Sequence, residues 1–296
     1  MSDIGYVLAA AAARHLPGWM SAGLALLIAD LHTWTHPARV RAVNLRLARV
    51  WRERGDRGAP PSARETTRAF ARALRDFLAA GHAVRGRIPP VRLDDEGRQI
   101  LHAARASGAS TVLVSGHFGP WEVALRWLAR EVGSVDALAA PHRLPAVERF
   151  FAATRAAYGV RTLSQGRPAA AALARLRAGG WIAALADRGP RRGGSQARRG
   201  GTEARRDSLV ALDRTPLLLA RRASAQILAG VAWRAPDGAI EVRFHPAFTL
   251  EPRWDGISLS QAIARLQGFF DAHVRAHPTQ WFHWEAGPAG SSADSV

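Results

Sequence analysis

Cysteine and lysine are both absent from this chain of 296 residues. Without cysteine the chain can form no disulfide, no thiolate metal site and no cysteine nucleophile. Without lysine, the formal net charge of +17 comes entirely from arginine, which is always ionised and binds phosphate through a planar fork. Such a surface attracts lipid phosphates, an acidic carrier protein or nucleic acid. A bias toward arginine codons explains the same composition without any function.

Motifs for nucleic-acid binding are missing as well. The chain contains no helix-turn-helix, zinc-finger or RNP-type aromatic motif, and its two tyrosines offer little for base stacking. We therefore expect no nucleic-acid partner.

Long hydrophobic runs are also lacking. Residues 4–13 and 16–29 are apolar, but polar, proline and glycine residues at 14–18 interrupt them, and neither run reaches the ~20 residues that span a bilayer. No positive residue precedes the first run, so a secretory signal is not expected. Two interpretations of residues 1–36 remain: a helical pair lying in the membrane interface, with tryptophans at the headgroups, or two helices packed on the core.

The most informative stretch is His117–Glu122, which follows the apolar run Thr111–Ser115. The run predicts a buried strand, and Pro120 with Glu122 is typical of the first turn of a helix. On one continuous helix, five residues would place His117 and Glu122 about 140° apart, so the two side chains meet only across a strand-to-helix corner. There Glu122 would accept from one imidazole nitrogen, while the other takes a proton from a substrate hydroxyl. Alternatively, His117 is only a histidine packed in the turn, and Glu122 is only a charge that suits the N-terminus of a helix.

Strand and helix patterns alternate after residue 110, which predicts a three-layer α/β/α sandwich. Asp237-Gly238 predicts a hairpin, so at least one edge of the sheet should be antiparallel. Helices over 37–51 and 63–85 precede the sandwich, and Ser260–His277 closes it. The predicted strands cover 111–115, 135–140, 160–163, 182–186, 226–233 and 239–248, and the predicted helices between them cover 121–131, 146–158, 169–177 and 217–223.

Six blocks of sequence follow one another between residues 39 and 284: Val43–Leu45, His117–Glu122, Pro141–Arg143, Leu176–Gly180 leading to Asp187, Ala220–Ala225 and His277–Trp281. In these blocks the chain resembles the lipid A biosynthesis late acyltransferases, which transfer lauroyl and myristoyl groups, and their relatives that acylate phosphatidylinositol mannosides. The resemblance implies a sandwich of the glycerolipid-acyltransferase type. It also implies three segments: a membrane-interface helical segment over 1–36, an acyltransferase domain over 37–285 and a flexible tail over 286–296.

The implied reaction moves a fatty acyl group from a thioester donor, acyl carrier protein or acyl-CoA, directly to a hydroxyl of a membrane lipid or glycolipid such as a lipid A precursor. The resemblance makes His117 the general base with Glu122 beside it. Arg143 and Arg155 match arginines of the family that hold a phosphate or polarise the thioester carbonyl. The implied location is the cytoplasmic face of the inner membrane, where an anionic surface would hold the protein peripherally or by an interfacial anchor.

Asp187 and Arg188 complete the predicted substrate-binding residues. Asp187 follows the strand predicted over 182–186, and the carboxyl ends of strands are where α/β sheets place functional groups, although capping of the next loop also explains it. The family usually has glutamine where Arg188 stands and aromatic residues where this chain has arginine and glycine. Ten arginines and three acids lie between residues 188 and 222, which favours an acidic carrier protein as the donor.

Two other functions stay open. A serine-type lipid esterase would use Ser115 or Ser208 with His117, but no Gly-x-Ser-x-Gly elbow occurs. A non-catalytic lipid- or polyanion-binding protein would keep the fold without the reaction. The segment 277–285 lacks the spacing of a metal motif and its aromatics suit packing or an acyl-chain wall, and the glycine pairs match no nucleotide fingerprint. We therefore expect no metal and no cofactor.

Overall fold

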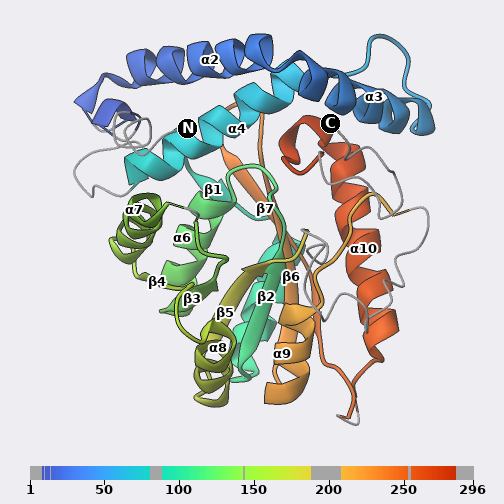
Figure 1. The fold of residues 1–296 in the computed structure, drawn as a ribbon. Coiled ribbons are helices and arrows are strands. Elements are labelled where there is room, and N and C mark those ends of the chain that lie inside the picture. Colours follow the sequence, from blue (N-terminus) through green and yellow to red (C-terminus); the bar gives the residue numbers. More distant parts are fainter. Residues whose placement is uncertain are drawn as a thin grey trace.

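A computed structural model describes the chain over residues 9, 11–13, 15–80, 89–142, 144–187, 208–252 and 255–284. A seven-stranded sheet lies between two layers of helices, in the order β1-β7-β6-β2-β5-β3-β4 (Figure 1). All neighbouring strands are parallel except β6 and β7, which are antiparallel. The strands are β1 (Val91–Arg92), β2 (Thr111–Ser115), β3 (Val135–Leu138), β4 (Val160–Leu163), β5 (Trp181–Leu185), β6 (Gln226–Arg234) and β7 (Ile240–Phe248).

The three-layer sandwich predicted from the sequence is confirmed. Alternate residues of each central strand enter two separate cores, one on each face of the sheet. One face is covered by α4 (Ala63–Ala80), α5 (Asp95–Ala106), α6 (Trp121–Val132) and α7 (Pro145–Ala156). The other is covered by α3 (Pro37–Glu53), α8 (Pro168–Arg177), α9 (Thr215–Ala223) and α10 (Leu259–Ala276).

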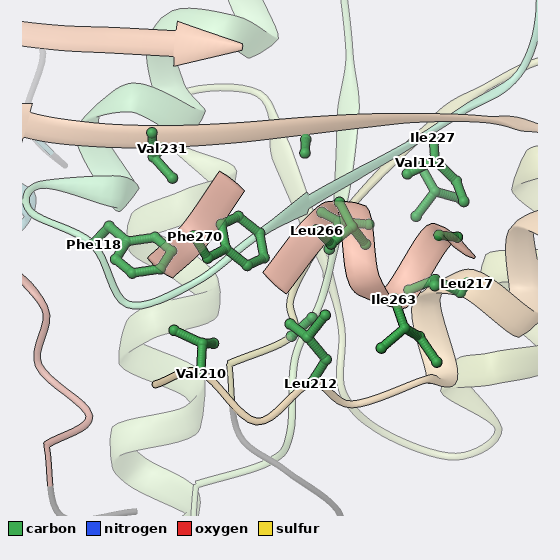
Figure 2. Packing of buried hydrophobic residues seen from close by; sticks show 14 of the residues in the cluster. Val112, Phe118, Val210, Leu212, Leu217, Ile227, Val231, Ile263, Leu266 and Phe270 are labelled. Atoms are coloured by element: carbon green, nitrogen blue, oxygen red, sulfur yellow. The ribbon is translucent and has the colours of Figure 1, made fainter. Parts of the chain in front are cut away.

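The core against α10 anchors the turn that follows β2. Phe118 is fully buried and its ring lies 5.2 Å from that of Phe270 of α10, with Val231 of β6 nearby (Figure 2). Truncating a buried phenylalanine typically costs about 3–5 kcal/mol of stability. The core therefore holds Phe118 in place, and with it the turn that contains His117.

Strand β1 and helix α5 were not predicted. The hairpin at Asp237-Gly238 is confirmed, but the antiparallel edge predicted with it is wrong, because β1 pairs in parallel with β7 and forms that edge. A strand of two residues gives no readable pattern. Helix α5 carries a clear start signal, because the side chain of Asp94 accepts a hydrogen bond from the Gly97 amide. The predicted helix over 63–85 is described as far as Ala80, and the remainder lies outside the described residues.

Helix α2 (Gly18–Thr35) packs along α4 and has one covered and one open face (Figure 1). On the covered face, Asp30 accepts hydrogen bonds from Arg64 and Arg68 of α4, and these bonds hold the pKa of its carboxyl well below the usual range. None of the described helices combines the length and apolar character needed to cross a membrane. The open face carries exposed apolar side chains: Trp19, Met20, Leu24, Leu27, Ile28, Leu31 and Trp34.

Candidate active site

His117 and Asp187 form a hydrogen-bonded pair at the carboxyl ends of two adjacent strands. His117 lies in the turn after β2, and Asp187 lies two residues after β5. The Nδ1 atom of His117 is 2.7 Å from Oδ1 of Asp187, and the backbone N–H of His117 donates to Oδ2 at 2.8 Å. The placement of His117 in the turn is confirmed. Asp187, predicted as a substrate-binding residue, has the imidazole as its partner.

The charge state of Asp187 fixes the tautomer of His117. Burial favours the neutral carboxyl, but the neighbouring His117 outweighs it, with His283 adding to the effect, and the pKa of Asp187 falls to about 2. An ionised carboxylate only accepts hydrogen bonds, so Nδ1 of His117 must carry the proton. In the neutral form of this imidazole, Nε2 is the unprotonated nitrogen and can act as a base.

Two glycines allow the turn to come this close to its neighbours. A Cβ on Gly116 would lie 2.6 Å from the Phe118 ring and 3.0 Å from Cβ of Asp187. Gly119 has a φ of +48°, and a Cβ there would lie 2.5 Å from the carbonyl oxygen of Ala232 in β6. A side chain at either position would force the turn that contains His117, or its neighbours, to shift.

Glu122 lies in the first turn of α6 as predicted, but its predicted hydrogen bond to His117 is wrong. Its carboxylate accepts from Nε of Arg155 at 3.1 Å and from Nη2 at 2.5 Å, and the Tyr158 hydroxyl lies 3.4 Å away. Both members of the ion pair are almost completely buried. Desolvation opposes the charge on Arg155, yet the adjacent Glu122 raises the pKa of the guanidinium above its usual value. A buried guanidinium competes for a carboxylate more strongly than a neutral imidazole does.

A cavity of about 660 Å³ lies between the sheet and helices α4, α6 and α7, and His117, Glu122 and Arg155 all line it. This volume is typical of small-molecule sites. The sheet contributes small side chains here, which leaves the space unfilled: Ala137, Ala183, Gly230 and Ala232. The helices contribute large apolar ones: Phe70, Leu74, Phe77, Leu125, Leu128 and Phe151.

The remaining predicted residues divide into those that the structure places and those outside it. Arg155 lines the cavity, whereas Arg143 and Arg188 lie outside the described residues. Ser208 donates to the Val210 carbonyl and to Asp271. Ser115 lines the cavity, and its hydroxyl donates to the Gly116 carbonyl at 3.5 Å. No group of three or more potential metal ligands gathers within the described part of the chain.

Two residues of the site escaped the sequence analysis. The indole N–H of Trp281 donates to Oδ2 of Asp187 at 3.0 Å, and the His283 ring lies 4.5 Å from that of His117. Packing by this segment was predicted and is confirmed, since Trp281 also contacts Trp284. None of the described residues of this segment is among those that line the cavity, so the acyl-chain wall, the other role expected of its aromatics, stays a prediction. Its distance from residue 117 in the sequence hid the contact.

The fold and the site together place a hydrogen-bonded histidine–aspartate pair beside an apolar cavity in a three-layer α/β/α sandwich. The family model for bacterial lipid A biosynthesis acyltransferases matches residues 61–285, and the chain belongs to this family. The protein is therefore an acyltransferase, and its family transfers acyl groups to lipids. A comparison with curated proteins gave no match.

Proposed function

We propose that the protein transfers a fatty acyl group from the thioester of an acyl carrier protein to a hydroxyl of a membrane glycolipid such as a lipid A precursor. The observation that carries this proposal is the His117–Asp187 pair at an apolar cavity large enough for a fatty chain. Burial of each methylene of a fatty chain in such an apolar cavity contributes about 0.8 kcal/mol to the free energy of binding. The polar pair supplies the chemistry and the cavity supplies the binding energy.

In the proposed reaction, Nε2 of His117 takes the proton of the acceptor hydroxyl as its oxygen attacks the thioester carbonyl carbon. The C–S bond then breaks, and the imidazolium returns the proton to the leaving thiolate. Asp187 stabilises the imidazolium while it exists, because the carboxylate remains ionised 2.7 Å away. Donor and acceptor react directly, and no acyl-enzyme forms.

We propose that Arg155 stabilises the negative charge that develops on the thioester oxygen, or binds a phosphate of a substrate. Nε and Nη2 are bound to Glu122, so the guanidinium is held in one orientation in the cavity wall. A fixed cation costs little reorganisation during the reaction. In this proposal Glu122 acts by orienting Arg155, and not by orienting His117 as the sequence predicts.

We propose from the resemblance that Arg143 and Arg188 contact the substrate. Both residues lie outside those described.

We propose an acidic carrier protein as the acyl donor because of the positive charge near the cavity. Helix α9 begins at the cavity, where Thr215 and Pro216 line it, and carries exposed Arg221 and Arg222. Replacing Arg198, Arg199, Arg205 and Arg206 by glutamine should slow transfer from the carrier at low salt and leave high-salt rates closer together. Faster turnover with acyl-CoA, unaffected by these changes, would contradict the carrier proposal.

Helix α2 is the proposed contact with an anionic membrane at the cytoplasmic face of the inner membrane. Its two tryptophans, Trp19 and Trp34, are 78% and 79% exposed and lie near opposite ends of the helix. Tryptophan prefers the boundary between headgroups and acyl chains. Helix α4, which contributes Phe70 and Phe77 to the cavity, lies against α2. A membrane bound at α2 would therefore lie close to the cavity.

The test of the proposed function is His117→Ala, assayed with acyl carrier protein donors and a glycolipid acceptor. Loss of the general base should lower the rate by on the order of a hundredfold or more, while the fold survives. His245→Ala, in β7, is the matched control. Transfer by His117→Ala at the parent rate would refute the mechanism. Hydrolysis of an ester probe that is lost in Ser115→Ala would favour the esterase, and binding without turnover would favour a non-catalytic protein.

A further inference from the structure

The segment Trp281–Trp284 joins the catalytic turn through its backbone. It follows α10 and the short helix η1 (Pro278–Gln280). The Phe282 amide donates to the His117 carbonyl at 3.1 Å, and the Gly119 amide donates to the Gln280 carbonyl at 2.7 Å. Phe118 and Trp281 form an antiparallel bridge between these bonds. The C-terminal segment is thus paired with the very residues that carry the base.

The segment also restrains the Asp187 carboxylate. Oδ1 faces Nδ1 of His117, while Oδ2 accepts from the His117 amide and from the Trp281 indole. Trp281 and Asp187 are both buried, so water does not replace the indole if it is lost. With three donors in fixed positions, the carboxylate cannot rotate away from the imidazole.

The His117 ring itself lies between two other rings. His283 contacts it at 4.5 Å between ring centroids with an interplanar angle of 61°, and Trp121 contacts it at 5.2 Å with an angle of 66°. Both are edge-to-face arrangements, which favour one ring orientation. His117 keeps Nδ1 on Asp187 only while its ring stays in this orientation.

We propose that Trp281 and His283 are positioning residues of the catalytic pair: Trp281 fixes the carboxylate and His283 fixes the imidazole. The proposal rests on the proposed function of His117 as the base. Neither residue belongs to the cavity wall described above, so each acts on the pair and leaves donor binding unchanged. Their loss should therefore lower kcat and leave KM near the parent value.

The first test compares two tryptophans of the same segment. Trp281→Phe keeps an aromatic ring but removes the donor to Asp187, and Trp284→Phe removes a donor to the Pro278 carbonyl instead. We expect Trp281→Phe to lower kcat about tenfold, the effect of losing one charge-assisted hydrogen bond, with little change in kcat for Trp284→Phe. Equal kcat values for the two variants, or a change confined to KM, would overturn the proposal.

The second test concerns His283. His283→Ala should lower kcat roughly two- to tenfold, the range expected for one aromatic pair, and His283→Phe should restore most of it. The proton signal of the His117 Nδ1–H, observed by NMR in selectively labelled protein, should move or broaden in Trp281→Phe and His283→Ala and stay in place in Trp284→Phe. An unmoved signal with unchanged kcat would dismiss the positioning role. Parent activity in His117→Ala would instead refute the proposed function itself.

Discussion

Arg155 donates two hydrogen bonds to Glu122 within the wall of the cavity that His117 lines. The acidic residue five positions after the base is therefore engaged by a cation 33 positions further along the chain. The sequence motif predicts a base with its orienter, whereas in the structure the acidic residue of the motif binds an arginine.

Glu122→Gln should lower the free energy of unfolding and leave the orientation of the His117 ring nearly unchanged. It leaves the buried Arg155 guanidinium without a counter-charge, and breaking a buried ion pair costs about 3–5 kcal/mol. Adding Arg155→Met to Glu122→Gln should recover most of that stability but not the activity, if Arg155 binds substrate. Urea unfolding and transfer rates of both variants check this. Full activity in the stable double variant would remove Arg155 from the reaction.

Asp187→Asn should lower kcat by on the order of a thousandfold. The asparagine amide can donate to Nδ1 of His117, which favours the tautomer with the proton on Nε2 and removes the base. The cavity is unchanged, so donor affinity should persist. Asp271→Asn, at a half-buried aspartate that accepts from the Leu209 and Val210 amides, is the control. A loss of only a few fold in Asp187→Asn would show that the carboxylate does not set the tautomer.

Ala183→Leu should shorten the acyl chain that the protein prefers. Ala183 lies on the sheet side of the cavity, and three added carbons would occupy space that the far end of a chain would fill. Each methylene that no longer fits should cost about 0.8 kcal/mol of binding. The ratio of kcat/KM for long and short donors measures the effect, and loss of folded protein lowers both alike. An unchanged ratio would place the acyl chain elsewhere.

Acid should destabilise the protein through His273. Burial first, then the charges of His277 and Arg243, lowers the pKa of this histidine from 6.5 to about 3. Below pH 6.5 the unfolded chain takes up a proton that the folded chain does not, so the free energy of unfolding falls as pH drops toward 3. The expected slope is about 1.4 kcal/mol per pH unit.

His273→Phe should flatten this dependence, and it also removes an Nε2 atom that has no hydrogen-bond partner within the described residues. His102→Phe, at an exposed position of α5, is the control. Denaturant unfolding at pH 7 and pH 5 gives the slopes. Equal slopes for the parent and His273→Phe would assign the acid sensitivity to other groups.

Replacing Trp19 and Trp34 by serine should weaken binding to anionic vesicles, and most clearly at high salt. Arginine attraction is screened beyond ~8 Å at physiological ionic strength, whereas apolar insertion is not. These point changes preserve the ion pairs of Asp30, which removal of residues 1–30 would break. Leu218→Ser, at an exposed position of α9, is the control. Unchanged vesicle flotation of the double variant would dismiss α2 as the anchor.

Local signals predicted most of the fold. The strands over 111–115 and 160–163 have the predicted bounds, and the other predicted strands differ by one or two residues. The runs that form β2 and β5 are mostly apolar because both faces of a central parallel strand are buried. The division into segments 1–36, 37–285 and 286–296 stays a prediction, and the tail lies outside the described residues.

The site was less predictable because its contacts are non-local. His117 was identifiable from the turn between strand and helix, but its partner was assigned to Glu122, the nearest acid in the sequence. Adjacent pairing of β2 and β5 brings Asp187 to His117, and no local pattern gives the strand order. The position of Asp187 at the carboxyl end of a strand predicted a functional residue, and only the sheet topology shows that its partner is His117.

The proposed base His117, the carboxylate of Asp187 and the indole of Trp281 come from three separate parts of the chain. Asp187 follows His117 by 70 positions, and Trp281 follows Asp187 by 94. During synthesis the nascent chain therefore holds an incomplete site until Trp281 has left the ribosome. Acyl transfer at full rate would then report that the chain as far as Trp281 has folded, since a product truncated before Trp281 keeps the histidine but lacks the segment that holds its partner in place.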